Sequence, residues 1–216
     1  MSPIRALIFA VLLAQPGAAE ILDRIAVTLD NRVIAESDLI REIQLSAFLN
    51  AARPDFSGAS KRAAAERLVE RALMRREMDF SRYPAPGDGE AVAALEKWRQ
   101  ERFAAGEAYR RALLEAKIVE PDLRRFLLEQ LTALRFIDFR FRPGVQVLPA
   151  EVRDYYEKRF LVQSRAAGVA HDPPFEEVAE RVEKILTEEK VDRMLDAWMK
   201  DARSRTRIVF RAAVFE

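Results

Sequence analysis

The stretch from Asp23 to Leu39 constrains the fold more than any other, because its pattern is that of a β-hairpin leading into a helix. Over its first part, apolar residues alternate with other residues, which is typical of a strand with one buried face. This stretch therefore predicts an amphipathic strand that buries Ile25, Val27 and Leu29 and turns Arg24, Ala26 and Thr28 to the other side.

The residues that follow predict a tight turn, a return strand and the start of a helix. Asp30-Asn31 supplies two residues that tolerate positive φ, as a two-residue hairpin turn requires. Val33-Ile34 is the short return strand. Ser37 is expected to cap the next helix, and Asp38 then lies in its first turn, where an acidic side chain suits the helix dipole.

A lone hairpin is only marginally stable in water, so this one is expected to have a partner. The segment from Arg207 to Arg211, RIVFR, is the last short apolar strand of the chain. We predict that both ends of the chain meet in one small sheet. The expected fold is mainly α: a multi-helix core with an N-terminal β-hairpin closed by a C-terminal strand, in a single domain over residues 20–216.

The first nineteen residues have the pattern of a secretory signal peptide. Arg5 gives the positive start, Ala6 to Ala14 is a short apolar run, and Gly17 to Ala19 offers small residues before a cut. The alternative is a membrane anchor, but the run is shorter than the roughly 20 residues of a spanning helix. We therefore expect residues 1–19 to be removed and the protein to be exported.

The charges of the chain are nearly balanced. Lys and Arg total 36 against 35 for Asp and Glu, and removal of Arg5 with the leader leaves 35 against 35. No basic excess therefore argues for nucleic acid as a partner. The chain has no cysteine, so an exported form has to rely on its apolar core instead of disulfides.

Apolar residues at helical spacing predict a series of helices behind the hairpin. The third is expected to bury Val92, Leu95 and Trp98. Proline- and glycine-containing breaks separate the segments. The expected helices cover residues 37–50, 61–80, 88–103, 109–116, 120–142, 149–160 and 172 to about 203.

One segment fits two structures. Along RFIDFRF, Ile137, Phe139 and Phe141 alternate with charged residues, which is typical of a strand. Nothing breaks the preceding helix before Pro143, however. We favour a helix that continues through this segment.

Three segments resemble the SurA-type periplasmic chaperones. DRIAVTLDNRVIAESDL looks like the opening of that family, VQVLPAEVRDYYEKRF (Val145 to Phe160) is similar to the end of its N-terminal helical domain, and Pro174 to Phe210 is similar to its C-terminal helix and strand. At the turn, Asp30-Asn31 replaces the family's usual Asn-Gly, and Asn also enters the left-handed region. The resemblance implies a periplasmic location.

Members of that family commonly carry parvulin-type prolyl isomerase domains between the last two motifs. Here only Leu161 to Asp172 lies between them, and an independent domain needs at least about 50 residues. The resemblance also implies a histidine pair with Cys or Asp at the isomerase site, whereas this chain has one histidine and no cysteine. We expect no isomerase activity.

Other chemistry finds little support in the sequence. His171 lies in an expected loop without the HxxxH or HExxH spacing of a metal site. No GxSxG, GxGxxG or GxxxxGK pattern occurs. We expect no enzyme, no metal and no cofactor.

The remaining class of function is the binding of another polypeptide through the protein surface. Phe139 and Phe141 have arginines between them at the end of a helix, and with Phe136 they are the candidate peptide-binding residues. The resemblance implies an ATP-independent holdase for unfolded outer-membrane or secreted proteins. The alternative is a structural or adaptor protein of an envelope complex that binds one folded partner.

Overall fold

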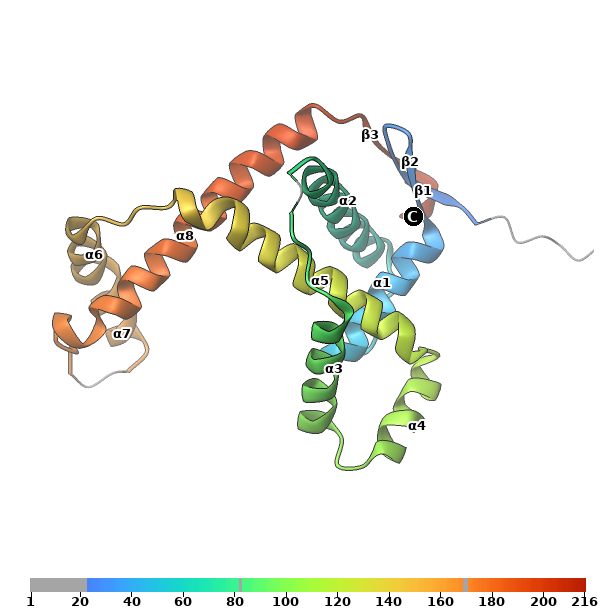
Figure 1. Ribbon diagram of the computed structural model, residues 1–216, viewed down its shortest axis with the longest axis horizontal. Helices are drawn as coiled ribbons and strands as arrows, with labels where there is room; N and C mark the ends of the chain where they lie inside the picture. Colours follow the sequence, from blue (N-terminus) through green and yellow to red (C-terminus); the bar gives the residue numbers. More distant parts are fainter. Residues whose placement is uncertain (1–22, 82, 169–170) are drawn as a thin grey trace, which may run out of the picture.

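The computed structural model describes residues 23–81, 83–168 and 171–216, and this part of the chain is mainly helical (Figure 1). The predicted leader lies outside the described residues. The elements are β1 (Ile25–Leu29), β2 (Arg32–Ala35), α1 (Glu36–Leu49), α2 (Gly58–Ser81), α3 (Asp88–Arg102), α4 (Gly106–Ala116), α5 (Glu120–Phe141), α6 (Pro149–Tyr155), a π-helical turn (Tyr156–Phe160), α7 (Leu161–Ala166), α8 (Phe175–Ser204) and β3 (Ile208–Phe210).

The two ends of the described chain meet in a three-stranded antiparallel sheet of order β2-β1-β3. The predicted hairpin and its closing strand are both confirmed. Asp30 takes the left-handed conformation at the turn, with φ of 49°. Its backbone N–H donates to the carbonyl of Arg207 at 2.9 Å, so the turn residue also begins the pairing with β3.

The predicted alternation along β1 fails at its first residue. The pairing with β2 shifts register between Ile25 and Val27, as a β-bulge does. Ile25 is therefore 45% exposed, whereas Ala26 is fully buried beside Val27.

The start of α1 also differs from the prediction that Ser37 caps it. The helix begins at Glu36, and the Asp38 carboxylate accepts the backbone N–H of Ala35 at 2.9 Å. Ser37 lies inside the first turn, where its backbone N–H donates to Asp23 at 3.2 Å. The acidic side chain in the first turn, not the hydroxyl, satisfies the free backbone donor at this end.

Glu36 connects the hairpin to α2. Its carboxylate pairs with Lys61 at 2.7 Å and with Arg24 at 2.6 Å. These two partners, Lys61 first, lower the pKa of Glu36 below its ordinary value of 4.5. The carboxylate therefore stays charged at neutral pH.

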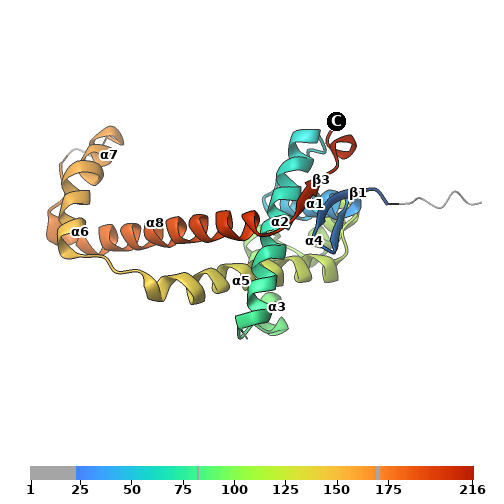
Figure 2. The ribbon, with the colours of Figure 1, turned by 90° about the horizontal axis from the view of Figure 1, so that it is seen from above.

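The molecule is open, with two arms that leave a common body (Figures 1 and 2). The body consists of the sheet, α1, α2 and the central part of α5. One arm is α3 and α4. The other is the distal lobe, defined as α6, the π-turn, α7 and the first half of α8, which α8 links back to the sheet.

Each of the three parts has its own apolar cluster. The sheet, α1, α2 and the end of α8 share one cluster, which includes Val27, Leu39 and Val69. The α3–α4 arm closes over the end of α1 and the start of α5 around the buried Tyr109, and burial raises the pKa of this tyrosine. In the α3 helix, Leu95 is buried as predicted, but Val92 faces solvent.

The distal lobe packs α6 and the π-turn against α8. Val152, Tyr155, Phe160, Val178, Val182 and Leu186 form its buried cluster. The Tyr156 hydroxyl donates to the carbonyl of Pro173 at 2.8 Å, which ties the π-turn to the start of α8.

The segment with two predicted structures is helical, as favoured, and α5 continues to Phe141. α8 crosses it there, and the Trp198 ring lies 6.4 Å from the Phe136 ring and 5.9 Å from the Phe141 ring, between centroids. Both phenylalanines are buried beneath this crossing. The aromatic contact therefore fixes α5 and the second half of α8 to each other.

The pairing of β3 with β1 gives a first prediction. Hydrogen-bonded and non-hydrogen-bonded residue pairs alternate along an antiparallel ladder. Asp30–Arg207 and Ala26–Arg211 are hydrogen-bonded, so Thr28–Val209, which lies between them, is a hydrogen-bonded pair as well. Val209→Pro removes the donor and should lower the free energy of unfolding by about 2–3 kcal/mol in urea titrations.

Val209→Thr is the matched control, because it keeps both the N–H group and the β-branch. It should cost less than about 1 kcal/mol. Equal losses in the two variants would contradict the role of β3 as the strand that closes the sheet.

Candidate functional site: a charged groove between three helices

A depression of the described surface lies where α2 faces α1 and α5. The largest hollow there has a volume of about 470 Å³. Two smaller hollows of about 260 and 180 Å³ adjoin it along α2 and α5. Arg71 lines all three, and we call them together the central groove.

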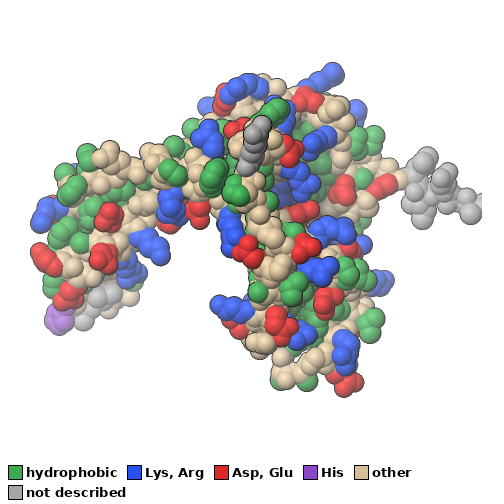
Figure 3. Space-filling view, in the orientation of Figure 1, with side chains coloured by type: hydrophobic (Ala, Val, Ile, Leu, Met, Phe, Trp, Pro, Cys, Tyr) green, Lys and Arg blue, Asp and Glu red, His purple; other side chains and the backbone are tan. Residues whose placement is uncertain are grey.

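Side chains of two kinds form the groove. Its apolar surface comes from α1, α2, α5 and the edge of the sheet, and the residues are Ile34, Leu45, Leu68, Met74, Met78, Phe126, Leu128, Ala133, Leu134 and Ile137. Arginines and carboxylates stand among them. The space-filling view shows this mixture of basic, acidic and hydrophobic side chains over the central body (Figure 3).

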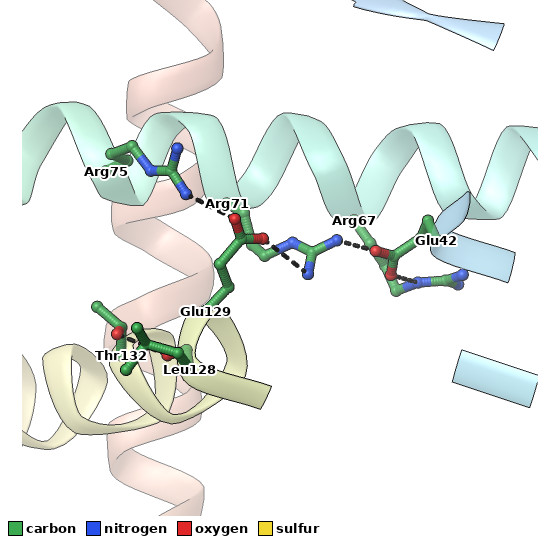
Figure 4. Close-up of polar contacts among 7 residues, drawn as sticks. All are labelled: Glu42, Arg67, Arg71, Arg75, Leu128, Glu129 and Thr132. Atoms are coloured by element: carbon green, nitrogen blue, oxygen red, sulfur yellow. Dashed lines mark hydrogen bonds and ion pairs between the residues drawn. The ribbon is translucent and has the colours of Figure 1, made fainter. Parts of the chain in front are cut away.

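An ion-pair ladder crosses the groove and joins the three helices (Figure 4). The α1 carboxylate of Glu42 accepts from Arg67 at 3.1 Å and from Arg71, both on α2. The α5 carboxylate of Glu129 pairs with Arg71 at 3.7 Å and with Arg75 at 3.3 Å. Arg71 is therefore the residue that links α1 to α5 through α2.

Burial makes the ladder costly to break. The Glu42 side chain is only 4% exposed and that of Arg71 only 14%. A buried carboxylate without a cation would pay a large desolvation penalty, so Glu42 depends on its two arginines. The Nε–H of Arg71 is itself buried without a hydrogen-bond partner in the described structure.

The three candidate peptide-binding residues have different surroundings. Phe136 and Phe141 lie in the interior under Trp198, so they offer no surface to a peptide, contrary to the expectation for them. Phe139 is 50% exposed. The Tyr83 ring lies 5.3 Å from that of Phe139, between centroids, and burial raises the Tyr83 pKa.

Phe139 lies close to the groove along α5. It follows Thr132, which lines the second hollow, by seven residues and so shares its helix face about two turns further on. An extended chain in the groove could therefore reach Phe139 as well.

The sequence interpretation missed the ladder. Its one visible signal is the arginine at every fourth position of α2, Arg67, Arg71 and Arg75, which places them on one helix face. Glu42 stands next to Ile43 of the buried stripe, but nothing local shows that its partners come from another helix. Among the described residues, no group of His, Cys, Asp and Glu could hold a metal ion. His171 is exposed.

A scan of protein-family models gives no match to this chain, and a search of curated proteins finds no significant relative. The likeness to SurA-type chaperones thus stays an expectation drawn from the three sequence segments.

The ladder generates a stability prediction. Glu42→Gln leaves Arg67 without the carboxylate it pairs with and leaves Arg71 with only the longer pair to Glu129, so it should lower the free energy of unfolding by about 2–3 kcal/mol. The loss stays below that of a fully buried pair because Arg67 is 46% exposed.

Glu90→Gln is the control in the same urea titration. Its pair with Arg135 is half-exposed, and such pairs contribute about 0–1 kcal/mol. A loss for Glu42→Gln no larger than that for Glu90→Gln would contradict the structural role of the ladder.

Proposed function

We propose that the protein is an ATP-independent holdase chaperone that binds unfolded outer-membrane or secreted polypeptides. The observation that carries the proposal is the central groove: an open depression with apolar and charged side chains side by side, on a body with two projecting arms. The proposal includes no isomerase activity.

An unfolded client offers apolar side chains, charges and unpaired backbone groups at once. The apolar surface of the groove gives non-directional attraction of about 25 cal/mol per Å² buried. The exposed arginines of the groove, Arg75 and Arg125, offer hydrogen bonds to the carbonyl groups of a client backbone without a requirement for one sequence. Such a surface suits many clients held loosely better than one ligand held tightly.

Exposed apolar side chains extend the surface beyond the groove. Phe139 of α5 and Phe80 at the end of α2 lie outside the groove and are at least half-exposed. Exposed apolar surface of this kind can take part in binding. These residues support a client path that is longer than the groove itself.

The proposed location is the periplasm. It rests on the signal-like pattern of residues 1–19 and on the SurA-like segments. Within the part of the chain that the structure describes, no helix combines the length and the apolar character needed to cross a bilayer.

The test is aggregation of a urea-denatured outer-membrane β-barrel protein after dilution, followed by light scattering without nucleotide. The proposal predicts suppression by near-equimolar amounts of the chain without its leader. Phe139→Ser should weaken the effect about 5-fold, because it removes about 1 kcal/mol of half-exposed apolar contact.

Leu114→Ser is the matched control, since Leu114 is an exposed apolar residue on α4, away from the groove. It should suppress aggregation as the parent chain does. Unchanged scattering with several clients, together with a stoichiometric complex with one folded envelope protein, would overturn the holdase proposal in favour of the adaptor.

A further inference from the structure

The central groove has hydrogen-bond donors to spare. Arg71 is taken up by the ladder, because its two terminal nitrogens face Glu42 and Glu129 and its Nε–H is buried. Arg125 lines the first two hollows, is 72% exposed, and its ion pair with Asp122 is as long as 3.9 Å. The guanidinium of Arg125 therefore has N–H donors available to a ligand on this surface.

Three of the four carboxylates that line the largest hollow are already paired with arginines. Glu42 and Glu129 each pair with two arginines of α2. Asp122 pairs with Arg41 at 3.2 Å, and Asp38 accepts the N–H of Ala35 at the start of α1. Most carboxylates of this hollow are thus paired with cations, whereas Arg125 is exposed and only weakly paired.

Apolar side chains lie beside these donors. In the largest hollow, Leu68 and Phe126 line the same space as Arg71 and Arg125. A ligand that fits the hollow would place a carboxylate on Arg125 and an adjacent apolar side chain on this surface. A lysine or arginine of the ligand would find three of the four carboxylates paired with arginines and would be repelled by Arg125.

We infer that the central groove selects extended client segments in which an acidic residue adjoins an aromatic or aliphatic one. This inference rests on the proposed chaperone function and names the client chemistry of that same site. Arg125 is the residue that binds the carboxylate. A free C-terminal carboxylate presents the same chemistry as an Asp or Glu side chain.

The test uses short fluorescein-labelled peptides and the chain without its leader, with binding followed by fluorescence anisotropy. One peptide carries Asp and Glu between Phe and Leu, with both ends blocked. A second replaces Asp and Glu by Asn and Gln, and a third is the second peptide with a free C-terminal carboxylate. We expect the acidic peptide to bind at least 5-fold more tightly than the blocked amide peptide.

Two variants assign that preference to the groove. Arg125→Gln, which breaks only a long surface pair, should reduce the preference to within about 2-fold. Arg124→Gln is the control: the neighbouring residue on α5 is exposed and does not line the groove, so the preference should persist. Equal preference in the two variants would overturn the assignment to the groove.

The outcomes separate the inference from the function beneath it. Tight binding of the third peptide supports the carboxylate site and identifies the chain end as its source. Equal affinity for acidic and amide peptides, or no peptide binding, overturns the inference while suppression of aggregation still stands. Failure of both peptide binding and suppression overturns the inference and the proposed function together.

Discussion

The contact between Glu42 and Arg71 is the interaction on which the rest of the structure depends. α2 has to approach α1 and α5 closely enough to shield the sheet, yet the three helices leave open space where they meet. The ion pairs of Arg71 with Glu42 and Glu129 span that space. Apolar side chains at the same positions would let the helices pack together and fill it. The ladder thus sets the spacing of the helices, and the spacing creates the groove. Because a buried carboxylate needs its cation, the arrangement resists collapse.

The open shape follows from the division of the core. The sheet, the α3–α4 arm and the distal lobe each bury a separate apolar cluster, and α5 and α8 connect them. Trp198 fixes these two helices to each other at their crossing, where it covers Phe136 and Phe141. A chain of this length with one continuous core would be more compact and would expose less surface between its helices. Here two arms leave the body in different directions (Figure 1).

Much of the fold could be predicted because its signals are local. The hairpin, the helix breaks and the closing strand follow from alternation, turn residues and helical spacing, and all are observed. The exceptions depend on distant contacts. The bulge that exposes Ile25 arises from pairing with β2, and the burial of Phe136 and Phe141 depends on Trp198, which lies 62 and 57 residues further along the chain. Glu42 likewise meets arginines that lie 25 and 29 positions further along the chain, so no local pattern predicts the groove.

The central claim is that clients bind in the central groove, and site-specific photo-crosslinking tests it most directly. A photoreactive residue replaces Leu134, which lines the groove and is 61% exposed, or Val162, which lies in the distal lobe and is 57% exposed. With an unfolded outer-membrane protein, the account predicts strong crosslinks from position 134 and weak ones from position 162. Crosslinks of equal strength, or stronger ones from position 162, would contradict it.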